Sequence, residues 1–285
     1  METEINNNEY IKKRYGGCYR SIHSPDELRM SDMILNKSPA DLPKEFNLID
    51  KCPEPRDQGQ QNSCGGFAGA LLRQMYLENT NICLSPAFLY WQSRSYNRQI
   101  NEDCGTCIRD ILQTLKEFGI SEEKNMPYNE TDYSTPPSKQ AYENAKMYKI
   151  NNYINVDNGI SGIKSYLYTK KKPVIFGMEI YDSFIEETGK TGIAPIPREG
   201  EVPISGHSCL IIGYRNNIFK DNLISVFNHK RSKYGYFIVL NSYGKDWGKH
   251  GMFLLPYEYV LFQKAYDFYV ISGNQSYESE VIQKK

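Results

Sequence analysis

The stretch that decides the fold is Asp57-Gln58-Gly59-Gln60-Gln61-Asn62-Ser63-Cys64-Gly65-Gly66-Phe67-Ala68, where a polar loop passes into a helix. Apolar residues then recur at i, i+3, i+4 and i+8, namely Phe67, Ala70, Leu71 and Met75. This spacing predicts a helix that begins near Cys64, with Ser63 or Asn62 as its N-cap. The positive end of the helix dipole is expected to lower the pKa of a thiol placed there, so Cys64 is a candidate nucleophile.

A nucleophilic thiol needs a base and a donor for the oxyanion. Gln58 lies six residues before Cys64, and its side-chain amide can donate to an oxyanion. The histidines are His23, His207, His229 and His250. His207 is the candidate base because it follows a glycine and precedes a buried apolar run. Asn241 follows another such run and is expected to orient the imidazole of His207.

Composition limits the classes of function. The chain has 285 residues, with 34 basic and 34 acidic side chains and no net charge. This balance argues against nucleic-acid or membrane binding and favours a neutral peptide or protein substrate. The first twenty residues are polar, and no apolar run is long enough to span a membrane, so we expect a non-secreted protein without a transmembrane segment. The cysteines besides Cys64 are then expected to be reduced thiols. They are Cys18, Cys52, Cys83, Cys104, Cys107 and Cys209.

The chain divides into parts of different character. Residues 1–41 read as an extension, 42–150 as mainly helical, 151–275 as mainly strand and 276–285 as a polar tail. Helix starts are predicted at Cys64 and Ser85-Pro86, and an apolar helical face from Ile108 stops at Gly119. The predicted strands are Val174–Ile180, Ser208–Tyr214, Tyr236–Leu240, Met252–Leu255 and Tyr266–Ile271, with irregular inserts at Asp182–Ser205 and 216–234. Helices followed by strands predict an α+β protein of two lobes, with the site in the cleft between them.

Separate motifs resemble those of papain-like cysteine peptidases of the C1 family. They are the segment from Gln58 to Cys64, the strand at Gly206-His207 and the block Asn241-Ser242-Tyr243-Gly244-Lys245-Asp246-Trp247-Gly248-Lys249-His250-Gly251-Met252-Phe253. Cys64 and His207 are 143 residues apart (207 minus 64), within the roughly 130–150 typical of the family. Asn241 lies 34 residues beyond His207 (241 minus 207), a longer spacing that the second insert explains.

The resemblance extends over residues 42 to about 271. It implies a helical L lobe and a β-barrel-like R lobe, and an endopeptidase that needs no metal or organic cofactor. It also implies that Gly105 lies in the wall that binds substrate backbone. Departures from the family pattern are Gln61, Gly65 and Tyr243; the last two are expected to alter the shielding of the imidazole. These features are similar to those of the non-secreted, cathepsin-like branch in bacteria and large DNA viruses, which implies a cytoplasmic or virion location.

Some alternatives stay open at this point. The rival readings are a Cys-dependent acyltransferase or amidase of the same fold and a catalytically silent binding protein. The spacing Cys104-Gly105-Thr106-Cys107 occurs in redox and zinc sites, but without a second ligand pair a structural role is favoured. Finally, the extension 1–41 is a candidate inhibitor in cis. Its segment Tyr15-Gly16-Gly17-Cys18-Tyr19 is expected to cover the cleft, because glycines permit close backbone approach.

Overall fold

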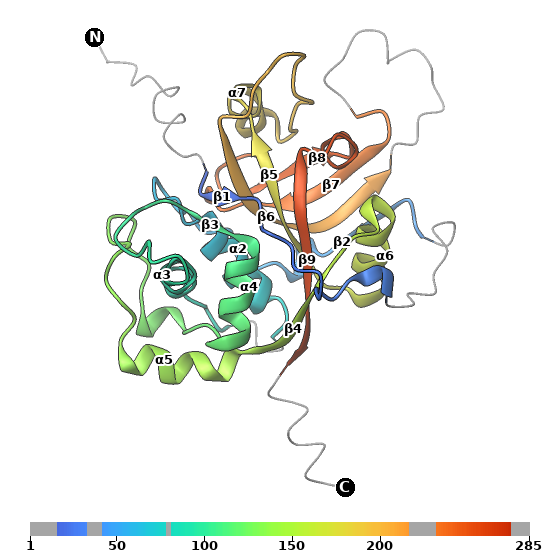
Figure 1. Ribbon diagram of the computed structural model, residues 1–285. Helices are drawn as coiled ribbons and strands as arrows, with labels where there is room; N and C mark the ends of the chain where they lie inside the picture. Colours follow the sequence, from blue (N-terminus) through green and yellow to red (C-terminus); the bar gives the residue numbers. More distant parts are fainter. Residues whose placement is uncertain (1–15, 33–41, 78–80, 217–231, 275–285) are drawn as a thin grey trace, which may run out of the picture.

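The computed structural model describes residues 16–32, 42–77, 81–216 and 232–274 (Figure 1). Helices gather in one lobe and a large sheet in the other, which confirms the predicted α+β class. Several expectations fall on residues outside the described ranges. They concern residues 1–15 and 33–41 of the extension, most of the second insert and the polar tail 276–285.

The helical lobe contains α2 (Cys64–Gln74), α3 (Pro86–Ser95), α4 (Ile108–Glu117) and α5 (Lys139–Ala145). The start of α3 follows its predicted signal, because the Ser85 hydroxyl accepts a hydrogen bond from the N–H of Phe88 at 3.1 Å. Gly119 follows α4 with a φ of +85°, a left-handed conformation that glycine adopts readily at helix ends. Local sequence signals therefore account for the start of α3 and the end of α4.

The second lobe is built on an antiparallel sheet. Its main strands are β4 (Ile150–Asn155), β5 (Val174–Ile180), β6 (Ser205–Asn216), β7 (Gly235–Leu240), β8 (Met252–Pro256) and β9 (Ala265–Asn274). Their spatial order is β4-β9-β5-β6-β7-β8. The strands β5, β6 and β7 are buried along almost their whole length, which explains why continuous apolar runs predicted them.

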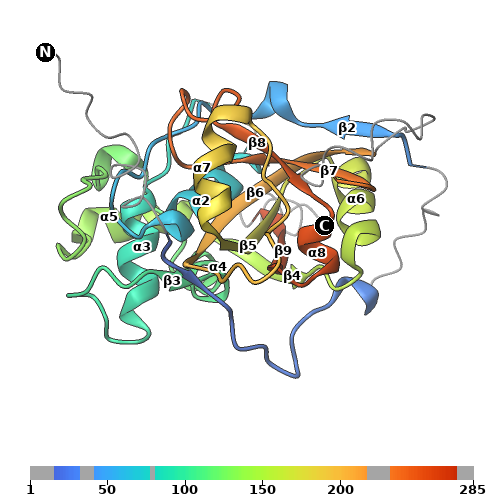
Figure 2. The ribbon, with the colours of Figure 1, turned by 90° about the horizontal axis from the view of Figure 1, so that it is seen from above.

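Short strands connect parts of the chain at the border between the two lobes. The strand β2 (Glu45–Asn47) pairs antiparallel with β6, with Phe46 opposite Tyr214, although residues from 42 onward were assigned to the helical lobe. A strand of three residues is too short for periodicity to reveal. The strands β1 (Cys18–Tyr19) and β3 (Thr106–Cys107) form a separate parallel pair, which joins the extension to the helical lobe (Figures 1 and 2).

Some helices of the second lobe were not predicted. They are α6 (Gly159–Lys170), α7 (Asp182–Thr191) and the short α8 (Glu258–Leu261). The expectation of an irregular insert at 182–205 is wrong over α7. Of its ten residues only Ser183, Phe184 and Thr188 are buried, so the helix carries little apolar periodicity. No helix in the described ranges is both long enough and apolar enough to cross a bilayer.

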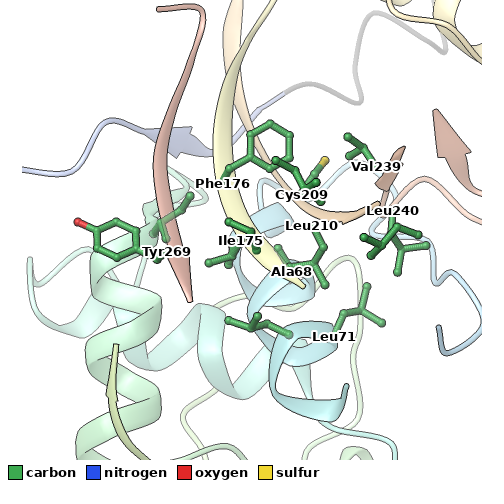
Figure 3. Close-up of a cluster of buried hydrophobic side chains, with 14 of the residues drawn as sticks. Ala68, Leu71, Ile175, Phe176, Cys209, Leu210, Val239, Leu240 and Tyr269 are labelled. Atoms are coloured by element: carbon green, nitrogen blue, oxygen red, sulfur yellow. The ribbon is translucent and has the colours of Figure 1, made fainter. Parts of the chain in front are cut away.

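The core lies where α2 packs on the sheet. Figure 3 shows Ala68 and Leu71 of α2 in one cluster with Ile175 of β5 and Leu210 of β6. Leu210 and Ile175 are fully buried, and they are partners across the β5–β6 ladder. Burial of a side chain of this size contributes about 1.5–3 kcal/mol. The core therefore fixes the start of α2, which carries Cys64, against the sheet strand that carries His207.

Close contact between α2 and α3 depends on Gly66. A Cβ atom at this position would stand 2.5 Å from the carbonyl oxygen of Pro86 and 3.1 Å from the Cβ of Tyr90. Neither atom can move away easily, because both belong to α3. Gly66 thus sets the separation of the two helices.

We expect Gly66→Ala to lower the free energy of unfolding by about 1–3 kcal/mol, because the methyl group overpacks the helix interface. At an exposed helix position the same change would stabilise by about 0.4–1 kcal/mol. Urea denaturation of the variant and the parent protein measures the difference. A gain in stability would contradict the close approach.

Candidate active site

Cys64 is the first residue of α2, as predicted, and it is fully buried. Ser63 occupies the N-cap position, but its side chain makes no capping hydrogen bond. Its hydroxyl instead lies 3.0 Å from the phenol of Tyr128, which donates to the carbonyl of Gln58 at 2.6 Å. A side chain from a distant loop therefore holds the start of this helix.

His207 lies on β6, and Asn241 directly follows β7. The His207 Nε2 atom is 2.8 Å from the Asn241 Oδ1 atom. The same oxygen accepts the backbone N–H of Ser242 at 2.8 Å. Because a peptide N–H can only donate, this atom of Asn241 must be the oxygen, and Nε2 must carry the hydrogen. In the neutral ring Nδ1 is then the basic nitrogen, and it is buried without a hydrogen-bond partner among the described residues.

Cys64 and His207, the expected nucleophile and base, lie on α2 and β6, which pack on each other. The backbone N–H of Ser208, the residue after His207, acts to lower the pKa of the Cys64 thiol. The Cys209 thiol is also buried there and donates to the Asn241 oxygen at 3.5 Å. The structure thus brings together Cys64, His207 and Asn241, which the sequence separates by up to 177 residues (241 minus 64).

Aromatic rings cover the imidazole. The ring of Tyr243 stacks on His207 with centroids 4.8 Å apart and planes inclined by 26°. Trp247 meets Tyr243 edge to face at 5.2 Å. Tyr243 departs from the family pattern, yet its ring shields the histidine and its hydrogen bond from water.

Gln58 is fixed in a buried position. Its Nε2 donates to the carbonyl of Gln61 at 2.9 Å, and its Oε1 accepts the hydroxyl of Ser242 at 2.6 Å. Its backbone N–H also donates to the Ser242 carbonyl at 2.9 Å. The amide nitrogen carries a second hydrogen that the bond to Gln61 does not use.

The extension passes directly over Cys64. The Cys64 thiol donates to the carbonyl of Gly16 at 3.3 Å, and the N–H of Thr106 donates to the carbonyl of Gly17 at 2.6 Å. Gly105, the expected substrate-wall residue, has a φ of +81°, and a Cβ there would stand 2.3 Å from Gly17. The strand β1 therefore occupies the wall on which substrate was expected (Figure 1).

This cover reverses the expected electrostatics. Burial raises the pKa of the Cys64 thiol to about 12, although backbone N–H groups of Ser208 and Gly65 act to lower it. Burial also lowers the pKa of the His207 imidazole to about 4, against the effect of its bond to Asn241. The expected depression of the thiol pKa is thus wrong for the covered form, because loss of hydration outweighs the helix end. At neutral pH both groups are uncharged.

Local contacts explain why Gly65 and Gln61 differ from the family pattern. A Cβ at Gly65 would stand 2.7 Å from the Cγ2 of Thr106, so this helix face has no room for an aromatic side chain. Gln61 donates from Nε2 to the carbonyls of Asn129 and Glu130 at 3.2 and 3.1 Å. Each residue fits a local contact that a larger or apolar side chain would not make.

All seven cysteines lie in the described ranges and are free thiols. Cys104 and Cys107 are not joined. Within the part of the chain that the structure describes, no cluster of three or more His, Cys, Asp or Glu side chains is arranged to hold a metal ion.

Sequence reasoning missed two residues that support the site. Ser242 binds the Gln58 side chain, and its place directly after Asn241 is the only signal that singles it out. Tyr128 holds Gln58 and Ser63, but a single tyrosine among 23 gives no local sign of this role.

Comparison with known proteins identifies relatives. Residues 42–262 match the family model described as papain family cysteine protease. An uncharacterized peptidase C1-like protein of Acanthamoeba polyphaga mimivirus is 31% identical over 229 residues, which are 75% of this chain and 68% of that protein. A cathepsin L-like proteinase of Fasciola hepatica is 25% identical over 202 residues, which are 70% of this chain and 55% of that protein.

Solved structures agree with this assignment. Xylellain, a cysteine protease from Xylella fastidiosa, superposes with a TM-score of 0.77 at 27% identity, covering 91% of this chain and 96% of that one. Procathepsin L 3 of Tenebrio molitor larval midgut has the same fold, with a TM-score of 0.63 at 17% identity over 94% of this chain and 78% of that one. The chain therefore belongs to the papain family of cysteine proteases.

Proposed function

We propose that this chain is an endopeptidase that cleaves peptide bonds with Cys64 and that its own N-terminal extension keeps it latent. The observation that carries the catalytic part is the bond from His207 to Asn241. It leaves Nδ1 of His207 as the basic nitrogen, on the strand against which the helix of Cys64 packs.

The reaction begins when Nδ1 of His207 takes the proton of the Cys64 thiol. The thiolate attacks the carbonyl carbon of the peptide and forms a tetrahedral intermediate. When this collapses, His207 returns the proton to the leaving amine, and a thioester remains on Cys64. Water, deprotonated by Nδ1, then attacks the thioester, releases the acid and restores the thiol.

The oxyanion of each intermediate needs donors that are already in place. Gln58 suits this role because Ser242 and Gln61 fix its amide while a second hydrogen of Nε2 is unused by them. The backbone N–H of Cys64 is the second donor, since the first N–H groups of a helix have no partner within it. Fixed donors of this kind contribute about 2.7–4 kcal/mol to transition-state stabilisation.

Latency is supported by the contacts of the two residues that directly precede β1. Gly16 and Gly17 accept hydrogen bonds from the nucleophile and from the wall at Thr106. The Cys64 sulfur meets the oxygen of Gly16 as a hydrogen-bond donor, so this contact is not an attack on a carbonyl carbon. Removal of β1 would readmit water, and the thiol and imidazole would regain the pKa values that permit an ion pair.

The other readings predict different results. An acyltransferase or amidase would transfer the acyl group to an added amine faster than to water. A silent binding protein would leave Cys64 unreactive toward alkylation even after removal of the extension. A location in the cytoplasm or in a virion fits the viral relative and the free cysteines.

In protein activated by Gly17→Ala, we expect Cys64→Ala to abolish hydrolysis of a quenched fluorescent peptide, because the thioester cannot form. Cys83→Ala is the matched control, since Cys83 is an exposed thiol outside the site and its loss should leave the rate unchanged. Turnover by folded Cys64→Ala protein would refute the proposed nucleophile.

We expect Gly17→Ala to raise peptidase activity at least tenfold. The Gly17 φ is +104°, and a Cβ there would stand 2.1 Å from the carbonyl oxygen of Asn62, so the methyl group forces β1 off the wall. Gly159→Ala is the control, since Gly159 has a φ of +57° but nothing within 4 Å of an added Cβ. Equal activity of both variants would argue against inhibition by β1.

The raised thiol pKa makes a further prediction for alkylation by iodoacetamide. Because only the thiolate reacts, the labelling rate of Cys64 in the covered protein should rise about tenfold per pH unit between pH 7 and 10. In Gly17→Ala the rate at pH 7 should be higher and depend less on pH. Mass spectrometry of the Cys64 peptide measures both profiles, and identical profiles would contradict the assignment.

A further inference from the structure

The segment that leads to Cys64 and the wall at Gly105 both lie against Gly17. A Cβ on Gly17 would stand 2.1 Å from the carbonyl oxygen of Asn62, which lies two residues before Cys64. A Cβ on Gly105 would stand 2.3 Å from the Cα atom of Gly17. The separation of Asn62 from Gly105 therefore sets the room that a backbone has beside the nucleophile.

Asp103 binds the segment that leads to Cys64. The backbone N–H of Asn62 donates to both carboxylate oxygens of Asp103, at 3.0 and 3.1 Å. The side chain of Asn62 donates from Nδ2 to the Asp103 carbonyl at 2.6 Å. Hydrogen bonds to a carboxylate are stronger than those between neutral groups. Asp103 thus holds Asn62 through its main chain and its side chain.

Tyr90, a buried residue of α3, joins the same carboxylate to the wall. Its phenol donates to the Asp103 Oδ1 atom at 2.5 Å and accepts the backbone N–H of Gly105 at 3.1 Å. These directions are fixed, because a peptide N–H can only donate and the phenol has one hydrogen. Hydrogen bonds through Asp103 and Tyr90 thus connect the wall to the segment before Cys64. This Asp103–Tyr90 connection contains no disulfide, since all seven cysteines are free thiols.

Arg94 fixes both ends of this connection in the helical lobe. Its guanidinium is buried and lies 4.0 Å from the centre of the Tyr90 ring. Its Nη1 donates to the carbonyl of Ile100 at 3.2 Å and also to that of Glu102, the residue before Asp103. The ring and the loop are therefore held by one side chain, which makes Asp103 a fixed anchor.

We propose that Asp103 and Tyr90 are positioning residues, which fix the wall relative to the nucleophile and so align a substrate backbone with Cys64. This proposal rests on the proposed peptidase function. Misplacement by about 1 Å can lower a rate about 100-fold. Loss of the connection should therefore slow attack on a peptide, which binds the wall, far more than reaction with a small alkylating agent, which does not.

The covered full-length chain tests the connection without catalysis. Tyr90→Phe removes the shared phenol oxygen and leaves every charge in place. It should loosen the two contacts of Gly17 and raise the rate at which iodoacetamide labels Cys64 at least threefold. Tyr142→Phe is the matched control, because it removes another partly buried phenol, which donates to Gln92 at 2.6 Å. Its labelling rate should equal that of the parent protein.

In the Gly17→Ala protein the direction of the effect should reverse. There Tyr90→Phe should lower kcat/KM for a quenched fluorescent peptide at least tenfold, but change iodoacetamide labelling of Cys64 less than twofold. A general loss of structure would instead change both rates together. Asp103→Ala breaks the same connection, so adding Tyr90→Phe to it should lower kcat/KM little further. Fully additive losses would contradict a shared role.

The two arms separate this proposal from the peptidase function. Equal labelling of Tyr90→Phe and Tyr142→Phe in the covered chain, or equal cleavage by the two in the active protein, would overturn the positioning role. If the Gly17→Ala protein is labelled rapidly at Cys64 but cleaves no peptide, the peptidase function is refuted. The labelling rates of the covered chain then still decide whether the connection exists.

Discussion

The oxygen of Asn241 sets the tautomer of His207, on which the proposed chemistry depends. It accepts the backbone N–H of Ser242 and so must face His207 as an acceptor, which assigns the hydrogen of the imidazole to Nε2. The ring is then fixed by one bond at its edge and by Tyr243 on its face. Without this constraint, the neutral imidazole has two tautomers, of which only one presents a base at Nδ1. A backbone amide thus selects the chemical state of a side chain on another strand.

In the covered site the proposed catalytic groups are present but uncharged. Cys64 begins α2 and His207 lies on β6, against which α2 packs, yet burial raises the pKa of the thiol and lowers that of the imidazole. Loss of hydration disfavours both the thiolate of Cys64 and the imidazolium of His207. Burial is the largest cause of both shifts, and the carbonyl of Gly16 is one of the groups that cover Cys64.

The sequence predicts the parts of this structure that depend on local signals. A continuous apolar run predicts β5, and the Ser85-Pro86 signal predicts the start of α3. The three residues of β2 and the weakly apolar face of α7 carry no such signal, because tertiary pairing and packing define them. The motifs likewise point to His207 and Asn241, whose Nε2 and Oδ1 atoms lie 2.8 Å apart. The pKa of the thiol could not be foreseen, because it depends on how completely a distant segment excludes water.

The pair of bonds between Gln58 and Ser242 has a mechanical consequence. One is made by backbone atoms and the other by side chains, and the adjacent residues Asp57 and Tyr243 form a β-bridge. These bonds hold the two lobes together beside Asn241 and His207. Rotation of the lobes about this point would separate the side chain of Gln58 from Ser242, the residue next to Asn241. The lobes therefore cannot rotate about this point without breaking both bonds between Gln58 and Ser242.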